Sequence, residues 1–389
     1  MKFEYRRVKL ADLTTTGKGT YGIAAPGVEK NDNLYTYLRI TDINDDGTLN
    51  RSDMKSVAND DAVQYLLKPN DIVFARTGGS TGRNYFYDGN DGTFVYAGFL
   101  IKFSIDPLKV NPKYIKHYCQ SDAYKNWVKS FNTGSTRGNI NAQTFGNMEI
   151  SLPPREQQDY LVSILEPLDE KIAINRAIND NLQQQAKALY QQMFIDNHVS
   201  GGYIGTLCDI ADITMGQSPN GSSYNEDGNG TVFFQGRAEF GFRFPSVRLY
   251  TTEPKRMACA NDTLMSVRAP VGDLNVAYTD CCIGRGLAAI HSKSNQQSFI
   301  LYTMFSLRKQ LEVFNGEGTV FGSINRTSLN ELPIFIPSDS EIVKFEAIVA
   351  PIDAAIRNNY EEICRLEKIR DTLLPKLMSG ELDVSAVQL

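Results

Sequence analysis

No apolar run in the chain approaches the roughly 20 residues that a membrane-spanning helix requires. The N-terminal stretch MKFEYRRVKL also lacks the hydrophobic core of a secretion signal. At 389 residues the chain is too long for one ordinary hydrophobic core. We therefore expect a cytoplasmic protein with about two or three globular domains and no membrane contact.

Cysteine and histidine are few, and their spacing matches no metal site or disulfide framework. The six cysteines include no C-x-x-C pair, and the three histidines are far apart and outside any H-E-x-x-H motif. We predict reduced thiols and no bound metal. The residues concerned are Cys119, Cys208, Cys259, Cys281, Cys282 and Cys364, with His117, His198 and His291.

Motifs for nucleotide binding and methyl transfer are missing as well. TTTGKGTYG (14–22) lacks the first glycine of a phosphate-binding loop, and no G-x-G-x-x-G follows a predicted strand. SLPPRE (151–156) does not match the Asn/Asp-Pro-Pro-aromatic tetrad expected of an amino-group DNA methyltransferase. The sequence predicts a chain with no catalytic site and no bound cofactor; an enzyme with an unrecognised site is the less favoured alternative.

The net charge of −5 is unevenly distributed. Residues 1–150 carry 19 basic and 16 acidic side chains, a net of +3, whereas residues 201–335 carry 11 and 12, a net of −1. The remaining acidic excess lies in 151–200 and 336–389. A chain of this kind remains compatible with DNA, because binding depends on local phosphate contacts rather than on whole-chain charge.

What the chain does contain is a long internal repeat. GSTRGNIN (134–141) returns as GTVFGSIN (318–325), an offset of 184 residues (318 − 134) that continues without a gap into the segments that follow. A repeat this long predicts a duplicated domain. The glycine-containing loop marks where each variable domain ends and the repeated part begins.

Upstream of this loop the relation between the copies continues with gaps. LADLT (10–14) aligns with IADIT (210–214), and PNDIVFAR (69–76) resembles ANDTLMSVR (260–268). The second alignment makes the strand end at Arg268 the counterpart of the one at Arg76.

Each copy has the same predicted order of elements. Short β-type runs broken by Gly, Asn and Asp turns are followed by a helical piece, the repeated loop, a short strand and a long helix. The predicted fold class is α+β: two similar mixed α/β globular domains separated by two long helices, with internal pseudo-two-fold symmetry. The predicted segments are 1–153 and 201–337 for the globular domains, and 154–200 and 338–389 for the helices.

The two long helices carry matching apolar stripes with a mean step of 3.5 residues, the coiled-coil period. Both stripes have Asn at the same position, a residue that can fix coiled-coil register. We predict an antiparallel coiled coil; two amphipathic helices packed separately on their own domains are the alternative. Pro167 and Pro351 are expected to start or to kink the helices. The predicted seam residues are Leu168, Ile172, Asn175, Leu182 and Leu189, with Ile352, Ile356, Asn359, Leu366 and Leu373.

These features resemble the specificity (S) subunits of type I restriction-modification systems. The resemblance is carried by ISLPPREQQDYLVSILEPLDEKI (150–172), by its repeated counterpart, and by the ending IRDTLLPKLMSGELDV (369–384). The run from MGQSPNGSSYNEDGNG (215–230) to CCIGRGLAAI (281–290) is similar to one recurring type of target-recognition domain. The resemblance extends over essentially the whole chain.

The resemblance implies a non-catalytic protein that reads a two-part, asymmetric site on double-stranded DNA. Each target-recognition domain would read one half-site, and the helices would set the gap. It also implies two methyltransferase subunits as partners, which bind S-adenosylmethionine and methylate adenine at its exocyclic amine, with a restriction subunit as an optional further partner. A coiled-coil adaptor whose globular domains bind protein or glycan is the alternative, and salt-insensitive partner binding would distinguish it.

Reading bases requires Arg, Asn, Gln, Ser or Thr on loops, with Lys and Arg on phosphates. Such residues stand at predicted strand ends and in Gly-rich loops of both domains. The predicted DNA-contacting residues are Lys18, Arg76, Thr77, Arg83, Asn84, Tyr85 and Arg137 in the first domain, and Gln217, Gln235, Arg237, Arg268 and Arg285 in the second. Most neighbouring aromatic residues, Phe99 among them, are expected to lie in the core.

Overall fold

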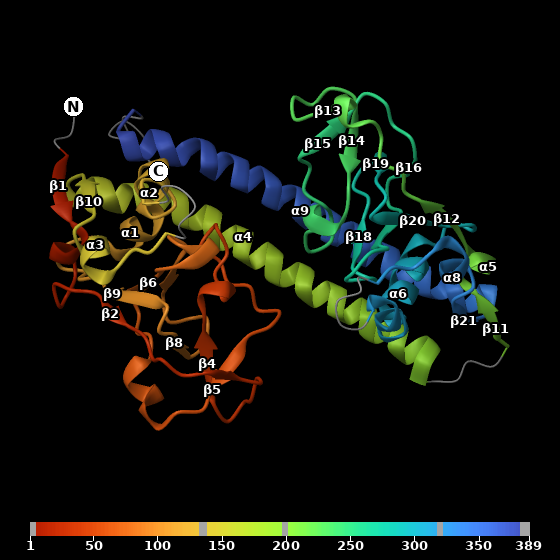
Figure 1. Cartoon of the computed structure of the whole chain (residues 1–389), viewed down its shortest axis with the longest axis horizontal. Helices are drawn as coiled ribbons and strands as arrows, with labels where there is room; N and C mark the ends of the chain where they lie inside the picture. Colours follow the sequence, from red (N-terminus) through yellow and green to blue (C-terminus); the bar gives the residue numbers. More distant parts are fainter. Residues whose placement is uncertain (1–4, 132–137, 197–200, 317–321, 382–389) are drawn as a thin grey trace. The chain divides into compact units, whose positions relative to one another are not determined.

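The computed structural model describes residues 5–131, 138–196, 201–316 and 322–381. It divides into two compact units: unit 1 consists of Met1–Ala173 and Ile363–Leu389, and unit 2 of Ile174–Glu362. Two long helices run through both units, α4 (Arg155–Tyr190), which continues as a π-helical stretch (Gln191–Asp196), and α9 (Asp339–Ser379) (Figure 1). No helix among the described residues combines the length and the apolar character that crossing a bilayer would require.

Among its described residues, unit 1 contains three small sheets and three short α-helices. Its strands are β1 (Arg6–Lys9), β2 (Thr20–Tyr21), β3 (Gly27–Val28), β4 (Tyr35–Leu38), β5 (Lys55–Val57), β6 (Asp71–Ala75), β7 (Asn84–Tyr87), β8 (Phe94–Tyr96), β9 (Leu100–Ser104) and β10 (Glu149–Leu152), and its helices α1 (Pro112–Tyr118), α2 (Asp122–Lys129) and α3 (Ala142–Gly146). The sheets have the orders β1-β10, β2-β9-β6-β7 and β3-β5-β4-β8. Strands β4 and β8 are parallel, and the other paired strands are antiparallel.

The described residues of unit 2 repeat this arrangement with one additional strand and one additional short α-helix. Its strands are β11 (Tyr203–Thr206), β12 (Ala211–Met215), β13 (Tyr224–Asn225), β14 (Thr231–Phe234), β15 (Leu249–Thr251), β16 (Met257–Ala258), β17 (Thr263–Ser266), β18 (Leu274–Val276), β19 (Cys281–Ile283), β20 (Leu287–Ser292) and β21 (Pro333–Ile336), and its short helices α5 (Leu207–Ile210), α6 (Gln297–Ser306), α7 (Arg308–Leu311) and α8 (Arg326–Asn330). The sheets have the orders β11-β21, β12-β20-β17-β18 and β13-β15-β14-β19-β16.

The two units therefore share one topology. Strands β2, β9, β6 and β7 correspond to β12, β20, β17 and β18, and the parallel pair β4–β8 corresponds to β14–β19. The strand pairs that open and close the two globules have the same register, with Arg6 opposite Leu152 and Tyr203 opposite Ile336. The predicted fold class and duplication are confirmed.

One part of the predicted alignment between the copies is wrong. LADL (10–13) forms a 3-10 turn in which the Leu10 N–H donates to the Met148 carbonyl at 2.9 Å. The same contact is made in unit 2 by the Leu207 N–H to the Leu332 carbonyl at 3.0 Å. The counterpart of LADL is therefore LCDI (207–210), which forms α5, whereas the similar letters IADIT lie mostly in strand β12.

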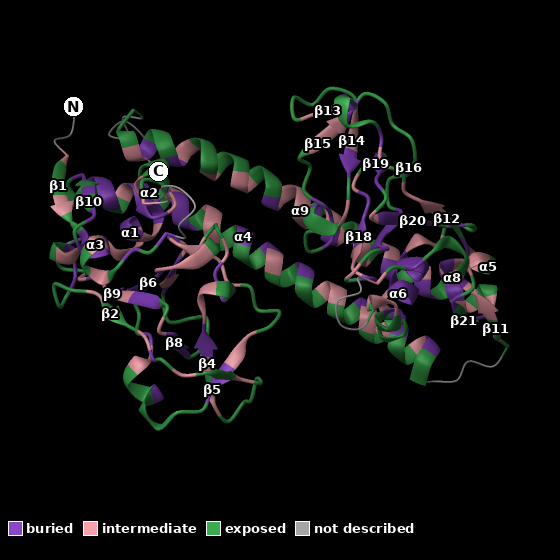
Figure 2. Cartoon of the chain, viewed as in Figure 1, coloured by how far each residue is buried: buried purple, intermediate pink, exposed green. Residues whose placement is uncertain are grey.

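The apolar stripes of α4 and α9 form the less exposed side of each helix (Figure 2). In unit 1, Leu165 from the start of α4 shares a core cluster with Leu374 and Leu377 from the end of α9. In unit 2, Tyr190 from the end of α4 contacts Phe345 from the start of α9, with ring centroids 5.6 Å apart. The helices are thus antiparallel, as predicted. The seam residues are buried (Ile172, Asn175, Ile356) or half-buried (Leu168, Leu182, Leu189, Ile352, Asn359, Leu366, Leu373).

Both prolines of the stripes lie well inside their helices, because α4 begins at Arg155 and α9 at Asp339. The prediction that Pro167 and Pro351 start the helices is therefore wrong. Both are exposed. A proline inside a helix removes one backbone hydrogen bond and can kink the helix. A kink at each of the two prolines therefore remains a prediction.

Three asparagines form a hydrogen-bond network between α4 and α9 in unit 2. Asn359 Nδ2 donates to Asn179 Oδ1 at 2.9 Å, and Asn179 Nδ2 donates to the Ile356 carbonyl at 3.2 Å. Asn175 Nδ2 donates to Glu362 Oε2 at 2.8 Å. Because a shift of one helix along the other would leave these buried and half-buried amides unpaired, the network fixes the register of the pair.

Replacing Asn179 by leucine is expected to lower the free energy of unfolding by about 1–3 kcal/mol, because the amide of Asn359 loses its partner. Asn359→Leu should act in the same direction. The double variant should recover most of the loss, since neither amide is then left unpaired. Urea unfolding of all four proteins gives the double-mutant cycle, and simple addition of the two single effects would contradict the pairing.

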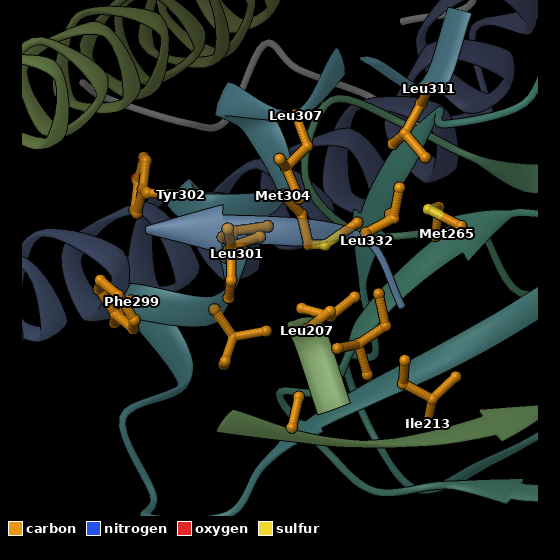
Figure 3. Packing of buried hydrophobic residues seen from close by; sticks show 14 of the residues in the cluster. Leu207, Ile213, Met265, Phe299, Leu301, Tyr302, Met304, Leu307, Leu311 and Leu332 are labelled. Carbon is orange, nitrogen blue, oxygen red and sulfur yellow. The ribbon is translucent and has the colours of Figure 1, made fainter. Parts of the chain in front are cut away.

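The globular cores hold the central strands in place. In unit 2 the helix α6 directs Phe299, Tyr302 and Met304 into a cluster that contains Leu207 and Met265 (Figure 3). In unit 1 the ring of Phe74 on β6 stacks on that of Phe145, with centroids 4.8 Å apart. Strands β6 and β17 are buried along their whole length, so the loops that follow them start from fixed points.

Candidate nucleic-acid interface

The end of strand β6 is the place in unit 1 where predicted DNA-contacting residues gather. The chain leaves the buried strand at Arg76 and Thr77, both half-buried. Thr77 forms a β-bridge with Asn139, and the Ile140 N–H donates to the Arg76 carbonyl at 2.9 Å. The last residues of the repeated loop are therefore held against the strand end by backbone contacts.

The guanidinium of Arg76 lies over one aromatic ring. Its guanidinium carbon lies 5.1 Å from the ring centroid of Tyr21, and its Nε is buried without a hydrogen-bond partner. The Tyr21 hydroxyl accepts the Ala142 N–H at 3.1 Å, which fixes the ring. Phe99, whose carbonyl accepts the Arg76 N–H, is 59% exposed. A cation over a partly exposed aromatic ring, with a second exposed ring directly before the adjoining strand β9, suits nucleic acid, which offers phosphates and flat bases.

The end of strand β17 in unit 2 repeats this backbone arrangement with different side chains. Arg268 forms a β-bridge with Ser323, and the Ile324 N–H donates to the Val267 carbonyl at 3.1 Å. Arg268 is exposed, and its side chain forms no ion pair or hydrogen bond with any other residue that the structure describes. A cation at a fixed strand end is therefore available to a partner.

The backbone contacts also correct the predicted match of the two strand ends. Asn70 and Asn261 both have φ of 73°, and each precedes an Asp, which begins β6 in unit 1 and stands directly before β17 in unit 2; these matching turns set the registers of the two strands. On this register Thr77, and not Arg76, corresponds to Arg268. The error was a single-residue gap, and in a strand a shift by one residue moves a side chain to the opposite face.

Three further loops of unit 2 converge beside Arg268. The Gly286 carbonyl accepts the Val267 N–H at 2.9 Å, and the Gln217 N–H donates to the Ile283 carbonyl at 2.9 Å. The Gly286 N–H donates to the Gln235 carbonyl at 3.3 Å.

A side chain at Gly216 would lie 2.1 Å from the Gly284 carbonyl, so glycine is required for this close approach. Gln217, Gln235, Arg268 and Arg285, all exposed, thus stand on loops joined backbone to backbone.

Comparison with known proteins identifies the family of this chain. The chain is 30% identical over 358 residues to the putative type I restriction enzyme MjaX specificity subunit of Methanocaldococcus jannaschii, covering 85% of this chain and 83% of that protein. The chain belongs to the type I restriction enzyme specificity subunits. A family profile described as the type I restriction modification DNA specificity domain matches residues 3–184 of this specificity subunit.

More distant members of the family extend over most of the chain as well. The type I restriction enzyme MjaIX specificity subunit of the same organism is 23% identical over 307 residues, covering 70% of this chain and 69% of that protein. The crystal structure of the type I restriction-modification system S subunit from M. genitalium has the same fold, with a TM-score of 0.56 at 17% identity, covering 97% of this chain and 96% of that one.

Several predicted contact residues of the specificity subunit are engaged in internal contacts instead. Asn84 is buried, and its Nδ2 donates to the Cys119 carbonyl at 3.1 Å. Tyr85 is buried too, and its hydroxyl donates to Asp91 Oδ2 at 2.6 Å; burial raises the pKa of its phenol. Both are structural residues, and the prediction that they face DNA is wrong. Arg83 Nε contacts Asp45 Oδ1 at 2.7 Å, so it ties a loop to the sheet.

The remaining predicted residues differ in their surroundings. Lys18 is exposed in the turn just before Tyr21. Arg237 forms an ion pair with Asp273 and is 48% exposed, so part of its charge is neutralised. Arg137 lies outside the described residues. Phe99 was expected in the core but is exposed, and Tyr21 was not predicted at all; a strand of two residues offers too little alternation to reveal which way a ring points.

Proposed function

We propose that the chain is the DNA-reading subunit of a type I restriction-modification complex, with one half-site of a two-part sequence read by each unit. The proposal rests on one observation above all. The two units present the same strand-end position to solvent but with different side chains, Thr77 beside Arg76 in unit 1 and Arg268 beside Arg285 in unit 2. A common scaffold with different edges fits two readers of different sequences.

In this proposal the chain itself is non-catalytic. Two methyltransferase subunits supply the chemistry: they bind S-adenosylmethionine and transfer its methyl group to the exocyclic amine of adenine. A restriction subunit joins the complex when cleavage is required. The helix pair α4 and α9 sets the distance between the half-sites.

Sequencing of the host genome with detection of N6-methyladenine, with and without the gene, tests the proposal. A two-part methylated motif should disappear when the gene is deleted. An unchanged methylation pattern, or loss of a continuous motif only, would count against it. Salt-insensitive binding to a protein or glycan, with no retardation of DNA, would favour an adaptor role instead.

Arg268→Ala is expected to weaken binding to DNA that contains the cognate site by about 1–3 kcal/mol, the usual contribution of an Arg contact to a base edge. The loss should depend on only one half-site, because Arg268 belongs to unit 2. Fluorescence anisotropy of the purified complex on duplexes altered in either half measures this. Lys293→Ala is the matched control, since it removes a cation from the opposite end of strand β20. Equal losses for both half-sites would contradict the assignment.

A further inference from the structure

A turn at the start of strand β17 brings three metal-ligating side chains of unit 2 together. The Asp262 N–H donates to the Cys259 carbonyl at 3.1 Å, and the Cys259 N–H donates to Asp262 Oδ2 at 2.8 Å. Asn261, with φ of 73°, allows this tight turn. Cys259 and Asp262 thus stand at the two ends of one turn, the short spacing that zinc ligands commonly have.

The third side chain comes from the neighbouring strand. His291 lies on β20, which pairs with β17, and its Nδ1 lies 2.6 Å from Asp262 Oδ1. One ligand atom each of Cys259, Asp262 and His291 lies within 4.8 Å of the others. Bonds of about 2.0–2.3 Å to zinc place tetrahedral ligand atoms about 3–4 Å apart, so little movement is needed to bind an ion.

Unit 1 has the same turn without the ligand chemistry. There the Lys68 N–H donates to Asp71 Oδ2 at 2.8 Å, the Asp71 N–H donates to the Lys68 carbonyl at 2.9 Å, and the Ser104 hydroxyl donates to Asp71 Oδ1 at 2.5 Å. Lys68 and Ser104 occupy the positions of Cys259 and His291. The fold therefore needs the buried aspartate and the turn, but neither the thiol nor the imidazole.

Exposure and charge set this cluster apart from an ordinary buried hydrogen-bond network. Cys259 is exposed and the side chain of His291 is 48% exposed, whereas that of Asp262 is only 5% exposed. Asp262 and Asp280 place negative charge near the sulfur of Cys259, and a divalent cation at this position would offset that charge.

We propose that Cys259, Asp262 and His291 form a zinc-binding site, with water in the fourth position. The thiolate, the carboxylate and the neutral imidazole are three of the ligand types that Zn²⁺ takes in proteins. Such an ion would join the start of β17 to β20, at the opposite end of the sheet from Arg268. The site is therefore expected to stabilise unit 2 without touching DNA. This proposal differs from the prediction, made from the sequence, that the chain binds no metal.

The other group of this kind among the described residues, His117, Glu166 and Asp169, does not support a metal site. Lys113 Nζ lies 2.6 Å from Glu166 Oε2, and Lys116 Nζ lies 2.7 Å from Glu166 Oε1 and 3.2 Å from Asp169 Oδ2. Two ammonium groups already occupy the positions that a cation would take.

Titration of the reduced full-length chain with Zn²⁺, in competition with a chromophoric chelator, tests the proposal. One equivalent should bind, and Co²⁺ should give the visible absorption of a tetrahedral thiolate complex. Cys259→Ser and His291→Ser should each weaken binding about tenfold or more, at least as much as the loss of a residue that supports a zinc ligand. His291→Ser introduces serine, the residue that unit 1 has at the equivalent position, Ser104.

Cys364→Ser and Cys208→Ser are the matched controls, since they remove thiols from other places in the chain. They should bind Zn²⁺ as the wild-type chain does. Zinc should also raise the melting temperature of the wild-type chain but not that of His291→Ser. Equal zinc affinity of wild type, Cys259→Ser and His291→Ser, or no binding by the wild-type chain, would overturn the site. Neither result depends on DNA reading.

Discussion

Glu166→Gln is expected to lower the free energy of unfolding of unit 1 by about 3 kcal/mol at pH 7. The Glu166 carboxylate on α4 forms ion pairs with two ammonium groups of the globule, that of Lys113 at 2.6 Å and that of Lys116 at 2.7 Å. The Glu166 side chain is 10% exposed. Removing one partner of a buried ion pair costs about 3–5 kcal/mol. The lower end applies because the lysines are about one third exposed and can rehydrate.

The same contact predicts how stability depends on pH. Burial alone would raise the pKa of Glu166, but His117, Lys116 and Lys113 together hold it well below its usual range. A carboxylate whose pKa is lowered by folding stabilises the folded state above its unfolded pKa of about 4.3, and this contribution is lost as the pH falls towards the folded pKa. The difference in stability between wild type and Glu166→Gln should therefore shrink below about pH 4.

Urea unfolding at several pH values measures both effects. The single tryptophan, Trp127, lies in α2 of unit 1, so its fluorescence reports on this unit. Glu170→Gln is the control: Glu170 lies one turn further along α4, is 64% exposed, and approaches Lys113 only to 3.8 Å. The control should change stability by less than 1 kcal/mol. Equal effects of the two variants at pH 7 would show that burial of the Glu166 pair contributes nothing.

Phe345→Ala is expected to destabilise unit 2 by about 3–5 kcal/mol, the usual cost of truncating a buried phenylalanine. The Phe345 side chain is fully buried at the start of α9. Its ring contacts Tyr190 of α4, at a centroid distance of 5.6 Å, and Phe299 and Tyr302 of α6, at 6.3 and 6.0 Å. One ring thus joins both long helices to the globule.

Hydrogen–deuterium exchange shows which segments Phe345→Ala destabilises. Peptides from α6 and the end of α4 should exchange faster in Phe345→Ala, whereas peptides from strand β6 in unit 1 should not change. Val343→Ala, on the same helix but 52% exposed, is the control and should leave exchange unaltered. Uniform acceleration over the whole chain would contradict the division into two units.

The helix pair could be predicted from sequence because its signal is local and regular. A step of 3.5 residues repeated over many turns predicts that the two apolar stripes pack against each other, and both stripes have Asn at the same position. The prolines were harder to interpret. Pro167 was expected to start or kink its helix, and the twelve residues of α4 that precede it (167 − 155 = 12) leave only the kink as a prediction.

The strand ends show where the sequence was insufficient. The segment IADIT (210–214) shares three residues with LADLT (10–14), whereas the true counterpart LCDIA (207–211) shares two, so identity of letters favoured the wrong register. Asn84 and Tyr85 have the polarity of DNA-contacting residues but lie buried, and their partners Cys119 and Asp91 are brought near only by the fold. The two Asn-Asp pairs, at 70–71 and 261–262, were the signal that could have fixed the strand register.

The central claim is that each unit reads its own half-site, and an exchange of units tests it most directly. The shared register provides the junctions: residues 203–336, from β11 to β21, are replaced by residues 6–152, from β1 to β10. The N6-methyladenine motif in a genome carrying this chimera is then sequenced. We predict a motif built from two copies of the unit 1 half-site; a motif that keeps the wild-type second half-site would contradict the account.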